Sequence, residues 1–380
     1  MRLLFLSTES SVHLHFSLPM AEVCRERGHE VILGCSEEPG ERGHSSIPDL
    51  IARGFQVIVL PYTRRLTPLR DAWAVVQTIR AIHRVRPFVV WTQTAKAGWI
   101  GRLSAWLCGV PHVVHTAHAW PFHDHLPRWK KRVYARLERL AVRWCHDLVC
   151  DSQTEAFLGR LALSPPRPTI NIIPMGVPVL FDPLTLASSR AATRTFLGIP
   201  SHALVIGNVC RFVPDKGLTT WLKIFKEIPS STARPVYGLL VGNGPLAPAL
   251  AQLATRLRIA DRLIFSGYQT DTPAYLSAMD IFLSPTRREG FGVSILEAMS
   301  LGLPVVTTKL PVLAEWIQEG QHGLLCPLDE VGSFAKAVTV LAESSSFRAQ
   351  MGAAAQAHVR QHYTQRGMVE AYAKVLRVDC

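Results

Sequence analysis

The sequence predicts an α/β protein with two doubly wound parallel sheets, and three observations lead to this prediction. Short apolar runs alternate with amphipathic helical patterns along the whole chain, as parallel strands joined by crossover helices require. A chain of 380 residues is long for one core and suits two domains of about 180 residues each. The alternation restarts after the proline-rich segment 174–190, which we expect to link the domains.

The expected elements follow in chain order. In the first half, the apolar runs that predict strands lie at 2–7, 29–35, 55–61, 88–93, 112–118, 147–152 and 170–174. The helical patterns between them lie at 17–28, 67–86, 97–109, 127–144 and 154–163. In the second half, strands are expected at 203–210, 236–242, 262–267, 280–285 and 304–308, and a late helix at 347–362.

The composition describes a globular protein. Apolar residues make up 48% and charged residues 18% of the chain, which excludes a disordered class. The 8 cysteines form no C-x-x-C pair, so we expect reduced thiols and neither a zinc site nor a disulfide framework. The run at 2–7 is too short for a signal peptide, and no window reaches the ~18 apolar residues that cross a bilayer. A cytoplasmic protein is expected.

The formal net charge of +12 favours an anionic partner. No nucleic-acid-binding signature is present, so we expect a membrane surface before a nucleic acid. The segment 127–144 predicts a basic amphipathic helix whose apolar stripe is formed by Trp129, Val133, Leu137, Leu140 and Trp144. Trp129 with Lys130, Lys131, Arg132 and Arg136 are the expected membrane contacts. The alternative is that the stripe packs on the domain's own sheet.

The stretch EGFGVSILE carries the strongest functional signal. It places Glu289 and Glu297 eight positions apart, between an apolar strand and the start of a helix. The carboxyl end of a strand in an open α/β sheet is where ligands bind, and a helix N-terminus there offers free N–H groups to a phosphate. Taken alone, the two acids fit a loop and a surface helix with solvated carboxylates as well as they fit a ligand-binding site.

Two similar junctions precede this stretch. Arg211 and Lys216 lie on a strand-to-helix turn that Gly217 closes, and two cations there suit a diphosphate. Gly242 and Gly244 form a tight turn after the next strand. Three strand–turn–helix junctions with phosphate-compatible or hydroxyl-compatible chemistry predict a nucleotide site.

These motifs resemble a known family. RFVPDKG, VGNGP, FSGY, EGFGVSILEAMSLGLPVV and AEWIQEGQHGLLCP, within roughly 205–330, resemble the C-terminal domain of the retaining glycosyltransferases of family 4. That family has the GT-B fold, in which two Rossmann-like domains face a central cleft. WTQTAKAGWIGRLSAWLCGVPHVVHTAHAWPFH is similar to the branch that builds bacterial surface polysaccharides and lipid-linked oligosaccharides. The resemblance implies an acceptor-side domain at 1–180, a nucleotide-sugar domain at 181–362, and a tail at 363–380 packed on the first domain.

The resemblance also implies roles for particular residues. The expected catalytic residues are His118, Arg211, Lys216 and Glu289. The expected donor-binding residues are Gly242, Gly244, Gly267, Tyr268, Gln269, Gly290, Phe291, Gly292, Val293, Ser294, Ile295 and Glu297. His118 matches a TAHG-like motif in which Ala119 replaces the glycine. For the neighbouring His112, His115, His123 and His125, whose spacing matches no metal motif, imidazoles satisfied by backbone groups are favoured over a metal site.

The first strand-to-helix turn lacks paired glycines, so we expect it to serve the acceptor, with Ser11 and His13. Lys96, at another strand end, is expected either to meet an acceptor phosphate or to be a solvated loop lysine. The implied activity is retaining transfer of a sugar from a nucleotide diphosphate, expected to be UDP, to a lipid-linked saccharide at the cytoplasmic face of a membrane. Neither metal nor cofactor is expected. The alternatives are a soluble acceptor, a sugar-nucleotide epimerase or hydrolase, and an inactive partner subunit.

Overall fold

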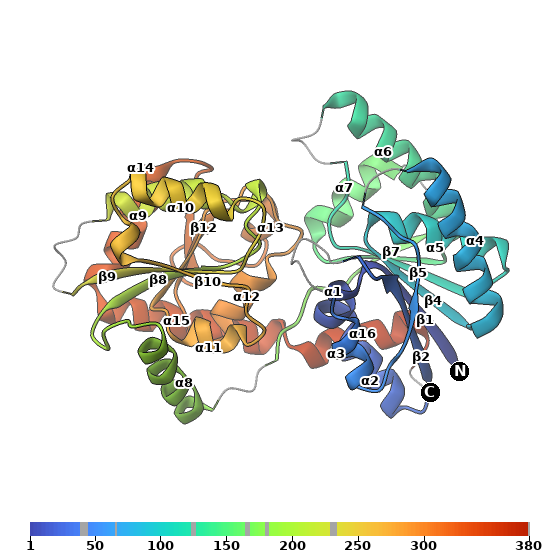
Figure 1. Cartoon of the computed structure of the whole chain (residues 1–380), viewed down its shortest axis with the longest axis horizontal. Coiled ribbons are helices and arrows are strands. Elements are labelled where there is room, and N and C mark those ends of the chain that lie inside the picture. The colour runs from blue at the N-terminus through green and yellow to red at the C-terminus, as the bar shows by residue number, and fades with distance from the viewer. Residues whose placement is uncertain are drawn as a thin grey trace. The chain divides into compact units, whose positions relative to one another are not determined.

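A computed structural model describes residues 1–38, 45–64, 67–122, 127–163, 168–178, 182–228 and 234–378. The chain divides into two compact units, drawn in Figure 1. Unit 1 contains Met1–Met175 and Gln365–Cys380, and unit 2 contains Gly176–Thr364. Each unit is an α/β fold around one parallel sheet, which confirms the predicted fold class.

The sheet of unit 1 has seven strands in the order β3-β2-β1-β4-β5-β6-β7. Their bounds are β1 Arg2–Glu9, β2 Glu30–Ser36, β3 Gln56–Val59, β4 Val89–Gln93, β5 His112–Ala117, β6 Asp147–Cys150 and β7 Thr169–Ile172. The strand order reverses between β1 and β4, and ligands bind outside the carboxyl ends of the strands at such a point. The central strands read as continuous apolar runs because parallel sheets are covered on both faces.

The helices of unit 1 cover both faces of this sheet. Figure 1 shows α4, α5 and α6 on one face and α2 and α16 on the other. The helices are α1 Ser10–Val12, the π-helix η1 His13–Ser17, α2 Leu18–Glu26, α3 Ile47–Ala52, α4 Pro68–Val85, α5 Ala95–Leu107, α6 Arg128–Ala141, the 3-10 helix η2 Val142–Trp144, α7 Gln153–Leu163 and α16 Gln365–Leu376.

The segment after β1 differs from the predicted turn. It is helical from Ser10, and η1 is a single π-helical turn that runs directly into α2. The His13 ring bonds the Ser17 hydroxyl and the Gly34 carbonyl of β2, which fixes this turn against the sheet. Single π-turns of this kind are frequent at functional sites.

Helix α16 belongs to unit 1 although it lies at the end of the chain. Its Tyr372 is buried, contacts the ring of Trp91 at 4.9 Å between centroids, and lies 3.3 Å from the Thr116 hydroxyl. His112 of β5 bonds the Val375 carbonyl at 2.8 Å. These contacts anchor the helix to β4 and β5.

Unit 2 has a six-stranded sheet in the order β10-β9-β8-β11-β12-β13. Its strands are β8 Leu204–Val209, β9 Val236–Val241, β10 Leu263–Gly267, β11 Ile281–Ser284, β12 Val305–Thr308 and β13 Gly323–Cys326. Its helices are α8 Pro183–Phe196, η3 Pro214–Lys216, α9 Leu218–Glu227, α10 Ala247–Arg256, η4 Ala260–Arg262, α11 Thr272–Ser277, α12 Val293–Ser300, α13 Pro311–Ala314, α14 Val331–Glu343 and α15 Ser345–His362. Strand β13 is absent from the prediction.

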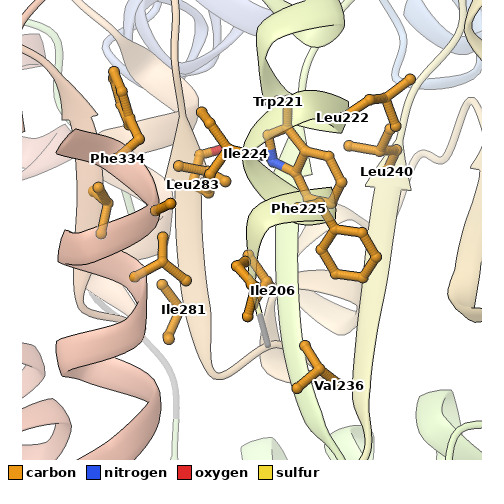
Figure 2. Close-up of a cluster of buried hydrophobic side chains, with 14 of the residues drawn as sticks. Ile206, Trp221, Leu222, Ile224, Phe225, Val236, Leu240, Ile281, Leu283 and Phe334 are labelled. Carbon is orange, nitrogen blue, oxygen red and sulfur yellow. Dashed lines mark hydrogen bonds between the residues drawn. The ribbon is translucent and has the colours of Figure 1, made fainter. Parts of the chain in front are cut away.

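The core of unit 2 lies between the sheet and the helices α9 and α14. Figure 2 shows Trp221, Leu222, Ile224 and Phe225 of α9 facing Ile206, Leu240 and Leu283 of the strands, with Phe334 of α14 beside them. The Trp221 indole also donates to the Leu283 carbonyl at 3.1 Å. This packing fixes α9 over β8 and β11, and so fixes the loops at their carboxyl ends.

Candidate functional site

Three loops meet at the carboxyl edge of the unit 2 sheet, after β8, β9 and β11. The order reverses between β8 and β11, so this is the switch point of the unit. The Thr286 hydroxyl donates to the carbonyls of Asp215 and Arg288, each at 3.1 Å, and so joins the β8 and β11 loops. A Cβ on Gly217 would lie 1.9 Å from the Pro285 carbonyl oxygen. Only glycine permits this approach.

Lys216 and Glu289 meet between these loops. The Lys216 Nζ donates to Oε1 and Oε2 of Glu289 at 2.7 and 2.9 Å. The Glu289 side chain is 8% exposed and that of Lys216 19%, so the pair lies in a partly desolvated position. Cys210 lies close enough to both charges to respond to them, although burial is the main cause that raises the pKa of its thiol to about 12. Two predicted catalytic residues are therefore in contact.

Helix α12 begins at Val293, four residues after Glu289, and its N-cap residue Gly292 has a φ of 98°. The side chains of Phe291 and Ile295 are buried, and the Phe291 ring stacks on Trp316 at 5.3 Å between centroids. Any ligand contact of these two residues is therefore through the backbone. The Ile295 N–H donates to the Gly292 carbonyl, and among the described residues the N–H groups of Gly292, Val293 and Ser294 at the start of the helix have no hydrogen-bond partner. Gly290 and Glu297 are partly exposed on either side of this turn.

The β9 loop packs against the β8 loop. A Cβ on Gly242 would lie 1.9 Å from the Cys210 carbonyl oxygen, and one on Gly244 would lie 2.6 Å from that of Phe212. Arg211, which stands between Cys210 and Phe212 in the sequence, is exposed. The β9 loop also reaches the predicted base-binding segment, because the Gly242 N–H donates to the Gly267 carbonyl. There Tyr268 and Gln269 are partly exposed, and the Gln269 amide donates to the Ser266 carbonyl.

In unit 1, His118 follows β5 and is held by both ring nitrogens. Its Nδ1 lies 2.8 Å from Oδ2 of Asp151, and its Nε2 lies 3.2 Å from Oε1 of Gln93. Trp120, two residues after His118, is buried, and its indole donates to the Glu155 carbonyl at 2.7 Å. His112 and His115 are buried in β5, whereas His123 and His125 lie outside the described residues.

The predicted acceptor-side residues are less accessible than expected. Ser11 is buried, and His13 is fully buried in the contacts of η1. Lys96 is the second residue of α5 and not part of a loop. Its ammonium bonds Asp71 at 2.7 Å and Thr63 at 3.0 Å, and its side chain is 11% exposed, so it is not a solvated lysine.

Sequence reasoning missed Gln93 and Asp151 as partners of His118. The signal for them was available, because all three residues follow or end neighbouring parallel strands. Polar residues at the carboxyl ends of adjacent strands meet at one edge of the sheet.

The basic helix of the prediction is shorter than expected. Helix α6 ends at Ala141, and Trp144 lies in η2, where it contacts Trp99 and Trp106 of α5. The face that α6 buries contains Glu138 and Ala141. Trp129 is 64%, Val133 44% and Leu140 42% exposed, so most of the predicted apolar stripe does not pack on the sheet.

Two properties of the described residues concern metal binding and membrane spanning. No group of three or more histidine, cysteine, aspartate or glutamate side chains there is arranged to hold a metal ion. Over the same residues, each helix is too short or too polar to cross a membrane.

Comparison with known proteins identifies the class. Residues 189–358 match the family described as glycosyl transferases group 1, and residues 16–176 match the glycosyl transferase 4-like domain. The UDP-Gal:alpha-D-GlcNAc-diphosphoundecaprenol alpha-1,3-galactosyltransferase of Escherichia coli is 28% identical over 281 residues, 72% of this chain and 71% of that protein. The D-inositol 3-phosphate glycosyltransferase of Streptomyces scabiei is 30% identical over 278 residues, 69% of this chain and 61% of that protein.

A solved structure shows the same fold. The crystal structure of Anabaena HepE in complex with UDP and glucose matches with a TM-score of 0.83 and 21% identity, and each chain is covered over 100% of its length. The chain belongs to the group 1 glycosyltransferases, family 4, with the GT-B fold. It is a glycosyltransferase that uses a nucleotide-sugar donor.

Proposed function

We propose that this enzyme transfers a sugar from a UDP-sugar to a hydroxyl of a lipid-linked saccharide, with retention at the anomeric carbon, in the synthesis of a cell-surface polysaccharide. The observation that carries the proposal is the Lys216–Glu289 pair beside the N-terminus of α12, at the switch point of the unit 2 sheet. The bound UDP of the HepE complex and the acceptor named for the Escherichia coli relative support the choice of donor and acceptor.

Each group in unit 2 has a role in this proposal. Lys216 and Arg211 bind the diphosphate and stabilise the negative charge that forms as its bond to the anomeric carbon breaks. The free N–H groups at the start of α12 add hydrogen bonds and a positive helix dipole. Glu297 binds the ribose hydroxyls, Glu289 lies by the donor sugar, and Gly267 to Gln269 lie near the base. The N–H groups and cations carry this stabilisation without a metal.

The bond changes balance without a protein nucleophile. The acceptor oxygen forms a bond to the anomeric carbon on the face that the diphosphate leaves. The acceptor proton passes to an oxygen of the departing phosphate. Retention follows because attack and departure occur on the same face of the sugar ring.

The exposed side of α6 supports a membrane-bound acceptor. Arg128, Lys130, Arg132, Arg136, Arg139 and Arg143 are exposed beside Trp129, Val133 and Leu140. Such a surface suits the interface of an anionic membrane, where each basic residue contributes about 1 kcal/mol. Trp106 and Leu107, at the end of α5, are also more than half exposed and extend the apolar contact. We propose on this basis that the enzyme is a peripheral protein on the cytoplasmic face of a membrane.

A soluble acceptor is the second candidate, because the Streptomyces relative is named for inositol 3-phosphate. The test measures UDP release from each UDP-sugar with no acceptor, with a diphosphoundecaprenol-linked GlcNAc, and with inositol 3-phosphate. Release that depends on the lipid-linked acceptor is expected. Equal release without any acceptor indicates a hydrolase and contradicts the proposal, and release with inositol 3-phosphate alone favours the second candidate.

A further inference from the structure

A chain of hydrogen bonds runs from Asp151 through His118 into the interior of unit 1. His118 contacts Asp151 at 2.8 Å and Gln93 at 3.2 Å. The Gln93 amide contacts the Ser17 hydroxyl at 2.8 Å. Ser17 contacts Nδ1 of His13 at 3.0 Å, and Nε2 of His13 contacts the Gly34 carbonyl at 3.0 Å. Gln93, Ser17 and His13 are fully buried.

The two ends of this chain only accept hydrogen bonds. A backbone carbonyl and an ionised carboxylate have no proton to donate. Each of the five hydrogen bonds needs one proton. If both imidazoles are neutral, each ring supplies one proton and the Ser17 hydroxyl supplies one. The Gln93 amide faces His118 with one end and Ser17 with the other, so it supplies one proton to only one of these neighbours, whichever way it is oriented. Four protons are therefore available, and the chain needs one more.

We infer that His118 carries this additional proton, so that an imidazolium paired with the Asp151 carboxylate is the resting state of the site. His13 is a poor alternative because it is fully buried and contacts a hydroxyl and a carbonyl but no acid. Burial lowers the pKa of His13 to about 4. Asp151 is also a poor alternative, because an imidazole is ordinarily a stronger base than a carboxylate.

The surroundings of His118 and Asp151 also support the assignment of the additional proton to His118. Asp151 is 2% exposed, and within the described residues its other oxygen, Oδ1, is buried without a hydrogen-bond partner. A neutral His118 would leave this carboxylate as an uncompensated buried charge, which is costly. The Phe16 ring lies 4.7 Å from the His118 ring, and the face of an aromatic ring is negative.

Burial favours the neutral form of three other titratable groups near the pair. Burial lowers the pKa of His115 on β5 far below its ordinary value. Burial raises the pKa of Tyr372 on α16 and that of the Cys150 thiol on β6. Glu155 of α7 is occupied by the Trp120 N–H at 3.0 Å, so Asp151 is the acid in contact with His118.

This assigns roles to His118, Asp151 and Gln93, and the assignment rests on the proposed function. An imidazolium with both N–H groups bonded to protein accepts no proton, so His118 is not a general base. The ion pair has no net charge, but the His118 side chain is 22% exposed and that of Asp151 2%, so the positive end of the pair lies on the side open to solvent, where a phosphate-bearing substrate would be stabilised. Asp151 and Gln93 are positioning residues that keep the charge and the ring orientation.

The test is ¹⁵N NMR of the histidine-labelled protein at neutral pH, with the His118 signals assigned by their loss in His118→Gln. We expect both ring nitrogens of His118 to be protonated. Asp151→Asn supplies the missing proton from its amide, so it preserves all five hydrogen bonds without the charge. In this variant one ring nitrogen of His118 should lose its proton. Asp147→Asn, on the same strand β6, is the control and should leave the His118 signals unchanged.

An unprotonated ring nitrogen of His118 in the wild-type protein would overturn the inference, and this readout remains valid if Asp151→Asn fails to fold. Two protonated nitrogens in a folded Asp151→Asn protein would overturn the role of Asp151. At saturating donor, Asp151→Asn should lower kcat by about tenfold or more, since it removes the positive end of this ion pair. An unchanged kcat would overturn the functional role. The spectrum needs no substrate, so a protein that shows the imidazolium but transfers no sugar contradicts the proposed function alone.

Discussion

Lys216 and Glu289 are 73 residues apart in the sequence and bonded in the structure. Each was predicted from its own strand–turn–helix junction, and their contact follows from strand order, because β8 and β11 are neighbours in the sheet. The contact adds a role for Glu289 that the motif does not show. It orients the Lys216 ammonium in a partly desolvated position, where a charge acts more strongly than in water.

Removing either cation of the β8 loop should reduce catalysis. Lys216→Ala and Arg211→Ala are each expected to lower kcat by about 10²-fold or more, since both remove charge that stabilises the leaving diphosphate. Lys223→Ala is the matched control, because Lys223 is an exposed lysine of α9. Steady-state kinetics with the lipid-linked acceptor measure the effect. Turnover near the wild-type value in both variants would remove these residues from the catalytic site.

Gly217 should tolerate no side chain. Gly217→Ala places a Cβ 1.9 Å from the Pro285 oxygen at a φ of 64°, so the β8 and β11 loops must separate. Gly198 has a similar φ of 68° and open space around it. Gly198→Ala should therefore cost only the left-handed strain of about 1 kcal/mol, and Gly217→Ala about 3 kcal/mol or more. Urea unfolding measures both, and equal losses would show that the contact with Pro285 does not matter.

At the scale of single residues, the positions of the groups on the glycine-rich loops of unit 2 were easier to predict from the sequence than the surroundings of the groups in unit 1. Glycines and cations at strand ends are visible in a motif. The environments of Ser11, His13 and Lys96 depend on long-range contacts, such as those of His13 with Gly34 and of Lys96 with Asp71. Burial at these positions is decided by tertiary packing, which a local pattern does not contain.

Helix α6 exposes large apolar side chains beside its basic residues. Its buried side holds the ion pair between Glu138 and Arg102 of α5, at 2.8 Å, so the polar residue faces inward and the large apolar residues face outward. A periodicity analysis assigns apolar residues to the buried side by default. Because α6 buries this charge pair, Trp129, Val133 and Leu140 lie on its exposed side instead.

Charge reversal on α6 should release the protein from membranes. The triple variant Lys130→Glu, Arg132→Glu and Arg136→Glu should lose binding to anionic vesicles at low salt, because these exposed residues provide the attraction. Vesicle co-sedimentation measures this. The control is the same charge change on unit 2, at the exposed Lys223, Lys226 and Arg256. Donor binding should be retained in the α6 variant.

Binding of the wild-type protein should also weaken with salt, since exposed charges are screened beyond roughly 8 Å at physiological ionic strength. Wild-type protein that ignores anionic vesicles at low salt would contradict membrane docking. Equal release by the unit 2 control would show that net charge, and not the surface of α6, determines binding.

For the molecule as a whole, the two parallel sheets were predictable because apolar runs and helical patterns alternate twice along the chain. The tail was harder to place from its own sequence. Its anchor is the contact of Tyr372 with Trp91 and Thr116, residues more than 250 positions away, and here only family resemblance led to the prediction. Strand β13, of four residues, was not predicted.

The whole enzyme should work without a divalent metal. In the proposed site, Lys216, Arg211 and the N-terminus of α12 provide the positive charge for the leaving diphosphate, so activity should survive excess EDTA. The assay compares transfer with EDTA, and with EDTA followed by Mg²⁺ or Mn²⁺. Complete loss with EDTA and recovery with either metal would mean that a cation is part of the site.

The central claim is that the loops after β8, β9 and β11 of unit 2 bind the nucleotide diphosphate of the donor. A crystal structure of the enzyme with UDP tests it most directly. We expect density for the diphosphate between the Lys216 ammonium and the first N–H groups of α12, with the ribose hydroxyls at Glu297 and the base near Gly267 to Gln269. Density for UDP at any other position, with these loops unoccupied, would contradict the account.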